Sequence, residues 1–528
     1  AAHSRRWWIL ATLCFSLLVI GVDNTILNVA LPTLVNSLHA SASQLQWMVD
    51  GYTLVFAGLL LTAGSLGDRF SRKRALSIGL VIFGTGSVLS AFAGSATMLI
   101  ATRSLMGLGG AFIMPATLSI LTNTVTNPAE RGKAIGIWAG VSGMGIAIGP
   151  IAGGWLLRHF WWGSVFLVNV PIVLTALVAG WFLIVDSKDP SAPRLDPIGA
   201  GLSIVGLTGL LWALIEAPSH GWLSPTILAA DALSLGVLAG FAAWESHTDH
   251  PMLDVRTFKN PRFSAASSAI TLVFFSMFGS FFILTQYLQD VQGASPLSAG
   301  LKVAPLAAVL FVAAPSSSSL VQWFGSKIVV AGGLAFAAFG LVLFALLRVD
   351  SSYPAVLFAL LMLGLGIALT MAPATESIMG SLPKEKAGVG SAVNDTTRQV
   401  GGALGVAVLG SVLSSGYASR IAGAVGRAAL PVTAAHAVHD SVGGALTVAR
   451  SVPGSAGQAL ATAAKQGFVG AMRPTMLIAA GVVVVGAMVV LAFLPARAVD
   501  VQTIEDLEEG TITIDELDPA LTGAPAVA

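Results

Sequence analysis

The chain has 528 residues, of which 55% are hydrophobic and only 10% are charged. A soluble domain carries about 25% charged residues, so this composition excludes a soluble enzyme or binding domain and indicates an integral membrane protein. The formal net charge of +1 provides no overall field for nucleic acid, and the single cysteine, Cys14, excludes an intramolecular disulfide.

Fourteen apolar runs are long enough to cross a bilayer, which requires about 20 residues of helix. The predicted spans are 8–34, 46–66, 75–94, 97–121, 134–157, 163–185, 198–216, 226–245, 264–288, 297–322, 328–347, 354–377, 388–413 and 474–495. The first run is too long for the apolar region of a signal peptide, so we expect no cleavage. The chain contains no G-x-x-x-x-G-K-[ST] motif, so we expect no ATP-driven step.

Basic residues gather in alternate connections between the spans. If the N-terminus is cytoplasmic, the inner connections hold Arg5, Arg6, Arg69, Arg72, Lys73, Arg74, Arg131, Lys133, Lys188, Arg194, Arg256, Lys259, Arg262, Lys327, Lys384, Lys386 and Arg497. The short outer connections hold little beyond Arg158 and Arg348. The positive-inside rule therefore predicts a multi-pass protein of the cytoplasmic membrane with both termini in the cytoplasm.

The connection before the last span, about 414–473, is long and rich in Ala and Gly. Its apolar residues recur at loosely helical spacing, which favours one or two short amphipathic helices over the outer mouth; a flexible linker is the alternative. The segment 499–528 carries acidic residues and no basic residue, and is interpreted as a solvated cytoplasmic tail.

Two pairs of segments show an internal repeat. MGLGGAFIMPATLSI (106–120) matches LGLGIALTMAPATESI (363–378), and PAERGKAIG (128–136) matches PKEKAGVG (383–390). The offset is about 255 residues in both comparisons. Spans 1–6 therefore correspond to spans 9–14, and spans 7 and 8 are an insert.

The repeat divides the chain into an N-terminal six-helix bundle (1–186), two inserted helices (187–262) and a C-terminal six-helix bundle (263–498). Two parallel halves with binding sites at their interface are an architecture of secondary transporters.

Asp23 lies within the first span, at a depth where an ionisable group costs about 2.5–3.5 kcal/mol on insertion scales. At 1.5 Å per residue, Asp23 lies about 17 Å below the outer end of its span, and Arg103 about 10 Å below the outer end of the fourth. A long Arg side chain can bridge that difference, so we expect the two to pair. Asp23 is then either a proton or cation site adjusted by Arg103, or half of an ion pair that only fixes the packing.

The connection between spans 2 and 3 reads GSLGDRFSRKR (64–74). It resembles the loop signature of the major facilitator superfamily, G-x-L-A-D-R-x-G-R-K-R, and the matching residues are Gly64, Leu66, Asp68, Arg69, Arg72, Lys73 and Arg74. Ser71 departs from the usual glycine. Asp68 can bond to the N-terminal amides of a facing helix, and the arginines can pair with carboxylates or lipid phosphates. Such a clamp would hold one conformation closed; a simple positive-inside anchor is the alternative.

In span 5, Gly145, Gly149 and Gly153 recur every four residues and share one helix face, on which another helix can approach closely. With Pro150 and Gly154 they form G-x-x-x-G-P-x-x-G-G, which resembles the antiporter motif of exporters in this superfamily. The motif favours export over uptake.

Four further segments, DNTILNVALP (23–32), WMVDGYTL (47–54), FLVNVPI (166–172) and NDTTRQVGGALGVAVLG (394–410), resemble the drug:proton antiporters with fourteen helices. The resemblance covers about 8–495. It implies an all-α major facilitator fold and export of amphiphilic, cationic drugs coupled to protons. We also expect no enzymatic reaction, no cofactor or metal besides the proton as coupling ion, and contacts with small-molecule substrates and membrane lipids but not with nucleic acid. The sequence leaves the oligomeric state open, with a monomer favoured.

Substrate contacts are predicted at Asp395, Asn24 and Glu376. Asp395 lies about 10 Å into span 13 and can attract a cation, or can instead pair with Arg398 one turn later. Glu376 is near the inner end of span 12, where a solvated position is the alternative. An exporter of a lipid or metabolite on the same scaffold is a rival function; a non-transporting receptor is a second, which Asp23, Arg103 and the span-5 glycines disfavour.

Overall fold

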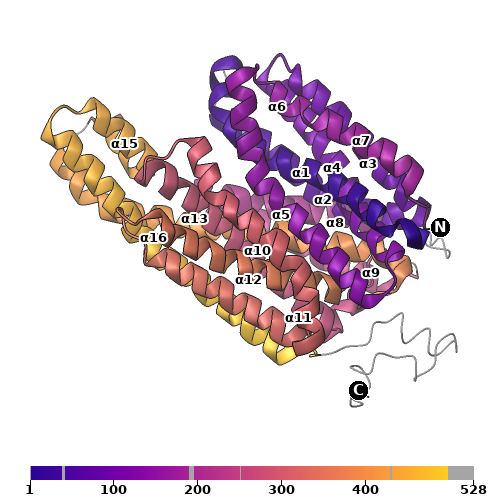
Figure 1. Cartoon of the computed structure of the whole chain (residues 1–528). Helices are drawn as coiled ribbons and strands as arrows, with labels where there is room; N and C mark the ends of the chain where they lie inside the picture. Colours follow the sequence, from indigo (N-terminus) through magenta and orange to yellow (C-terminus); the bar gives the residue numbers. More distant parts are fainter. Residues whose placement is uncertain (1, 39–41, 189–195, 250, 429–430, 497–528) are drawn as a thin grey trace.

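The computed structural model describes residues 2–38, 42–188, 196–249, 251–428 and 431–496, and the chain within these ranges is helical without strands. The predicted acidic tail lies outside the described residues. The first and last described residues lie at the same end of the helical bundle (Figure 1), as an even number of spans requires.

The helices follow the apolar runs of the sequence. They are α1 (Ala2–Leu38), α2 (Ala42–Phe70), α3 (Arg72–Ala91), α4 (Ala96–Thr124), α5 (Pro128–His159), α6 (Ser164–Leu167), α7 (Asn169–Leu183), α8 (Pro197–His220), α9 (Pro225–His247), α10 (Pro261–Gln286), α11 (Pro296–Ala345), α12 (Tyr353–Met379), α13 (Ala387–Ala428), α14 (Val432–Asp440), α15 (Val442–Ser451) and α16 (Ser455–Phe493). Short helical turns are η1 (Val255–Lys259), η2 (Tyr287–Val291) and η3 (Lys384–Lys386). Side-chain caps fix several starts: the oxygens of Ser71, Ser95 and Asp196 accept from backbone amides in the first turns of α3, α4 and α8.

Thirteen helices in the described part of the chain are long and apolar enough to cross a membrane. One of them, Leu297–Ala345, has 49 residues, or about 74 Å at 1.5 Å per residue, more than twice the hydrocarbon thickness. Its backbone leaves the helical conformation at Gly325, where φ is +79°, a value that favours glycine. This helix therefore provides two spans, and the structure agrees with the fourteen that the sequence predicts.

The internal repeat is visible in how helices meet. In the first half, α3 and α4 cross where a Cβ on Gly109 would lie 2.7 Å from the carbonyl oxygen of Gly79. In the second half, α11 and α12 cross where a Cβ on Gly366 would lie 2.6 Å from the carbonyl oxygen of Gly333. The same close crossing recurs at positions that the sequence repeat aligns.

The inserted pair α8–α9 packs on the outside of the two halves. α8 contacts both α2 and α13. Leu211 of α8 is buried with Leu54 and Ala57 of α2, and Val400 and Ala403 of α13 pack against this cluster. The insert therefore bridges the first and second halves.

The predicted outer connection is wrong in extent. The two short helices α14 and α15 are present, but α13 continues to Ala428 and α16 already begins at Ser455, so much of 414–473 extends the flanking spans. No proline occurs in α13, and the first one after it is Pro431, so nothing stops the helix at the membrane boundary. Tyr417 and Ile421 of α13 are buried together with Phe468 of α16. The two extensions and α14–α15 form a helical projection at one end of the bundle (Figure 1), which we call the outer projection.

Candidate coupling and gating sites

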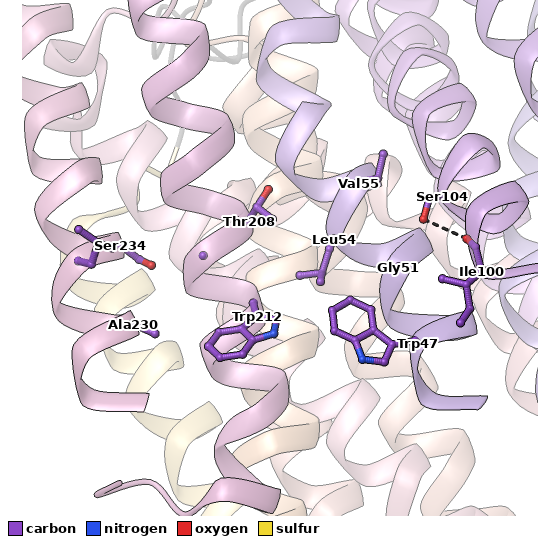
Figure 2. Close-up of a pocket in the computed structure, with 12 residues that line it drawn as sticks. Trp47, Gly51, Leu54, Val55, Ile100, Ser104, Thr208, Trp212, Ala230 and Ser234 are labelled. Carbon is purple, nitrogen blue, oxygen red and sulfur yellow. Dashed lines mark hydrogen bonds between the residues drawn. The ribbon is translucent and has the colours of Figure 1, made fainter. Parts of the chain in front are cut away.

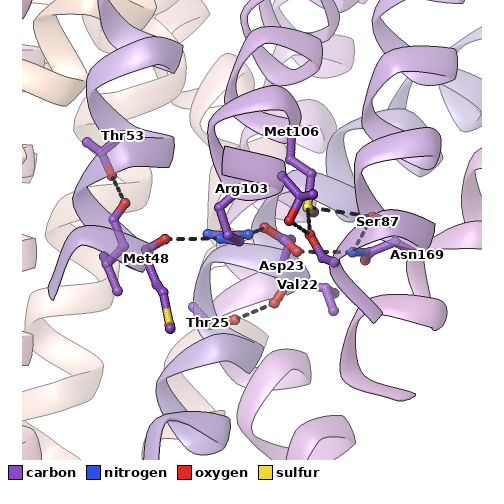
Figure 3. A network of polar contacts seen from close by, with 12 residues as sticks. Val22, Asp23, Thr25, Met48, Thr53, Ser87, Arg103, Met106 and Asn169 are labelled. Atoms are coloured by element: carbon purple, nitrogen blue, oxygen red, sulfur yellow. Dashed lines mark hydrogen bonds and ion pairs between the residues drawn. The ribbon is translucent and has the colours of Figure 1, made fainter. Parts of the chain in front are cut away.

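Asp23 lies in the interior of the first half. Its side chain is fully buried and forms an ion pair with Arg103 of α4 through Oδ2. The amide of Asn169, in α7, donates to Oδ1 at 3.0 Å. The expected pairing of Asp23 with Arg103 is present, and a third side chain completes it (Figure 3).

The partners of Asp23 are themselves held by two further helices. Arg103 Nε donates to the carbonyl oxygen of Met48 in α2 at 3.2 Å, and the guanidinium lies 4.5 Å from the ring centroid of Tyr52. Asn169 also donates to Ser87 of α3 at 3.2 Å. The network thus joins α1, α2, α3, α4 and α7.

Sequence reasoning missed Asn169, Tyr52 and Ser87 as members of this network. Asn169 is the one polar side chain in the apolar run FLVNVPI, which is a usable signal for a buried hydrogen bond. Ser87 carries no such signal, because serine is common in spans and usually bonds to its own helix.

The contacts of Arg103 depend on the charge of Asp23. If Asp23 takes up a proton, the carboxyl group becomes neutral and the attraction that holds Arg103 is lost. Arg103 then retains the Met48 carbonyl and the Tyr52 ring, both on α2. Arg103 therefore connects the Asp23 carboxylate to α2.

The glycine face of α5 packs on the part of α1 that carries Asp23. A Cβ on Gly145 would lie 2.5 Å from the backbone of Gly21, and one on Gly149 would lie 2.8 Å from Cβ of Thr25. Thr25 also donates to the carbonyl oxygen of Gly145 at 2.7 Å. Gly153 meets Ile26 one turn further on. These glycines fix the position of Asp23, because any side chain there would force α1 and α5 apart.

The other residues of this motif, Pro150 and Gly154, face the second half. Cβ of Pro150 lies 2.9 Å from the Cβ that Gly300 would carry, and Gly154 faces Leu297, both on α11. The motif therefore has two contacts, one within the first half and one between halves.

The junction of α2 and α3 joins the two halves at the end of the bundle where Asp68, Arg131 and Lys386 lie, which we call the basic end. Asp68 accepts from the backbone amides of Gly388 at 2.9 Å and Val389 at 3.1 Å, in the first turn of α13. Arg72 donates to Asp68 Oδ1 at 2.7 Å and to the carbonyl oxygen of Glu385 at 2.8 Å. The contact that the sequence predicts between Asp68 and the N-terminus of a facing helix is present in this structure.

Ser71 and Lys73 hold this junction to the end of α7 and to the residues that follow it. Ser71 adopts extended backbone with φ 175°, which any residue can adopt, and its hydroxyl caps α3 and bonds to Asp186. Lys73 Nζ donates to the carbonyl oxygens of Trp181 and Ile184 at 2.8 Å each. Serine therefore fits where the family has glycine. Arg69 lies over the ring of Phe70, and Arg74 is exposed.

A second charged contact crosses between the halves at the basic end. Arg131, in α5, pairs with Glu376, in α12, at 2.6 Å. The side chain of Glu376 is only 19% exposed, so the solvated position considered for it is wrong. The sequence could not indicate this pair, because the two residues are 245 positions apart.

Asp395 and Arg398 lie together on α13, with Arg398 Nη1 3.6 Å from Asp395 Oδ1. The guanidinium of Arg398 lies 4.7 Å from the ring of Trp138 in α5 and 5.3 Å from the ring of Phe274 in α10. Trp138 belongs to the first half and Phe274 to the second, so this pair lies where the halves meet. Asn24, also predicted to contact substrate, is exposed beside Asp23.

Comparison with known proteins gives a consistent result. Residues 13–406 match the Major Facilitator Superfamily. The chain is 37% identical over 489 residues to a multidrug efflux pump, LfrA, of Mycolicibacterium smegmatis, covering 92% of this chain and 96% of the pump. It is 34% identical over 494 residues to a tetracenomycin C resistance and export protein of Streptomyces glaucescens, covering 93% and 92% of the two chains.

Two further matches are to a resistance protein and to a solved structure. A methyl viologen resistance protein, SmvA, of Salmonella typhimurium is 34% identical over 474 residues, covering 88% of this chain and 93% of that protein. Among solved structures, the human organic anion transporter MFSD10 superposes with a TM-score of 0.63 at 12% identity, covering 92% of this chain and 99% of the other. At 12% identity, the match to MFSD10 supports the fold alone.

Proposed function

Because the chain belongs to the major facilitator superfamily, we propose that it is an efflux transporter that exports amphiphilic, cationic drugs or antibiotics in exchange for protons. The printed names of its relatives, which concern multidrug efflux, tetracenomycin C export and methyl viologen resistance, support drug export. The observation that carries the coupling to protons is the fully buried Asp23, held by Arg103 and Asn169.

One helix links the proposed proton site to the proposed gate. α2 contributes Met48 and Tyr52 to the Asp23 network and Asp68 to the contact with α13. Tyr52 and Asp68 are 16 positions apart, or about 24 Å along the helix. A proton that changes how Arg103 holds one end of α2 therefore acts on the helix whose other end closes the halves.

The energy of one proton is sufficient for useful export. A proton that moves down about 150 mV releases about 3.5 kcal/mol. At 1.4 kcal/mol per tenfold, this supports a concentration ratio of a few hundred-fold.

The test is transport by the purified protein in proteoliposomes with an imposed pH gradient. We expect uphill accumulation of a quaternary ammonium dye such as ethidium, with counterflow of protons, and none when the gradient is collapsed. The same vesicles should be offered a neutral antibiotic and a fluorescent phospholipid. If the pH gradient moves only the phospholipid, the proposed function is wrong and the protein is a lipid exporter.

Asp395 is proposed to attract the cationic part of the substrate. Asp395→Asn would leave the buried Arg398 without its anion and make the interface between the halves more positive. We expect affinity for a cationic substrate to fall about tenfold, or about 1.4 kcal/mol, and affinity for a neutral one to change little. Equilibrium binding of both substrates to the variant measures the difference. An equal loss for both would mean that Asp395 only supports the local structure.

The proposed orientation places the basic end in the cytoplasm and the outer projection outside. Arg74 and Ser451 are both exposed and lie at opposite ends of the bundle. With Cys14 replaced by Ser, an impermeant maleimide added to intact cells should label Ser451→Cys and should label Arg74→Cys only after the cells are opened. The reverse pattern would invert the topology.

A further inference from the structure

A pocket of about 560 Å³ lies between the inserted helices and the first half. Its walls come from α2, α4, α8 and α9, and its twelve lining residues include Trp47 and Trp212 (Figure 2). Two of the lining residues are glycines at close approaches between the walls: a Cβ on Gly209 of α8 would lie 2.5 Å from the hydroxyl oxygen of Ser234 of α9, and one on Gly51 of α2 would lie 3.1 Å from that of Ser104 of α4.

The pocket lies within the thickness of the membrane. On α2 it extends from Trp47 to Val55, about 12 Å at 1.5 Å per residue. That length approaches the thickness of one leaflet, half of the hydrocarbon core of about 30 Å. The pocket is at the end of the spans away from the basic end, and its wall residue Leu233 is 69% exposed, so it is accessible from the side of the bundle.

The lining suits a hydrocarbon chain better than a cation. None of the twelve lining residues has an ionisable side chain. The hydroxyl of Ser104 already donates to the carbonyl oxygen of Ile100 at 3.1 Å. A cationic drug here would lose its hydration and gain no counter-charge, only the ring faces of Trp47 and Trp212.

The packing explains why the space would not stay empty. Protein interiors are close-packed, and the atoms that line a void lose their dispersion contacts. Leu54 lines the pocket and also belongs to the buried cluster with Leu211 through which the insert bridges the halves. An occupant would therefore complete the contact between the insert and the first half.

We propose that this pocket binds one acyl chain of a phospholipid from the leaflet next to it, as a lipid that holds the α8–α9 hairpin to α2 and α4. This assignment does not depend on the direction of transport or on protons.

The experiment uses the full-length protein in vesicles of phosphatidylethanolamine and phosphatidylglycerol that contain a phospholipid with a diazirine on its acyl chain. After irradiation, mass spectrometry maps the labelled residues. We expect concentrated labelling on lining residues of α2, α8 and α9, above that of Leu228 and Leu235, which are exposed on α9 outside the pocket.

Ala230 lines the pocket, whereas its neighbour Ala229 is exposed and does not. Ala230→Phe should fill the space and lower labelling of the lining about tenfold, or about 1.4 kcal/mol, while Ala229→Phe leaves it unchanged. Ala230→Leu, a smaller filling, should give an intermediate loss and guards against misfolding of the larger variant.

Labelling of the lining no stronger than that of Leu228 and Leu235, or unchanged by Ala230→Phe, would overturn the proposal. Loss of labelling when ethidium is added would also overturn it, because the pocket would then be a cargo site. Retained labelling in the presence of ethidium supports the lipid.

Discussion

Asp23→Asn should abolish uphill export, reducing the proton-driven concentration ratio from a few hundred-fold to one. Asparagine keeps the size of the side chain and its bond to Asn169 but cannot take up and release a proton. Downhill movement of substrate should persist, since the substitution leaves the interface between the halves intact. Accumulation and efflux of ethidium in the same proteoliposomes, with and without a pH gradient, separate these two effects.

Two further variants make the result interpretable. Removing one partner of a buried ion pair costs about 3–5 kcal/mol, so Asp23→Asn alone could be unstable. The double variant Asp23→Asn/Arg103→Gln removes both charges, should be more stable, and should still fail to couple. Ser87→Ala removes the bond to Asn169 and the contact with Met106 Sδ but leaves both charges in place, and should retain uphill export. Uphill export at full rate by the double variant would assign the proton to another group, with Asp395 next.

Gly64→Ala should reduce transport at least about tenfold, the equivalent of 1.4 kcal/mol against closure at the basic end. A Cβ on Gly64 would lie 2.5 Å from the carbonyl oxygen of Gly388 and 2.9 Å from Cβ of Ala392, both on α13. These are rigid atoms of the other half, so α2 and α13 must separate, and the amides that Asp68 holds move away. Substrate uptake into proteoliposomes measures the loss.

The same helix offers a matched control. A Cβ on Gly67 would meet only Cβ of Ala75 at 3.4 Å, an ordinary contact, so Gly67→Ala should transport normally. The separation of α2 from α13 can be measured independently through the reactivity of a cysteine. Ser391, a buried residue of α13, is replaced by Cys in a chain without Cys14. A permeant maleimide should label it faster when Gly64 is Ala. Normal transport by Gly64→Ala would mean that the two halves do not need this close approach.

Several parts of these sites could be predicted because they depend on one dominant physical term. The cost of an ionisable group in hydrocarbon makes Asp23 and Arg103 conspicuous, and comparing their depths was enough to pair them. The contact of segment 64–74 could be predicted because a carboxylate such as Asp68 suits the N-terminal amides of a facing helix. The repeat could be read from two pairs of short segments, since each half must build the same helix crossings.

Other contacts depend on the three-dimensional arrangement and left no signal in the sequence. Glu376 reads as a solvated residue near a helix end, and only the approach of α5 to α12 brings Arg131 to it. The outer projection was underestimated because hydropathy reports where apolar runs stop, whereas α13 and α16 continue as helices beyond their apolar parts. The pocket beside the insert was not predicted, since no single residue marks a space between four helices.

α13 has a further consequence for how motion could be observed. It runs for 42 residues, about 63 Å, from the amides held by Asp68 to the outer projection. A stiff rod of that length acts as a lever: a tilt of about 10° about its gated end would sweep the far end through about 11 Å. The far end of α13 therefore magnifies small changes at the gate. A spin label on the outer projection, paired with one on the first half, would resolve states that differ by only an ångström where the halves touch.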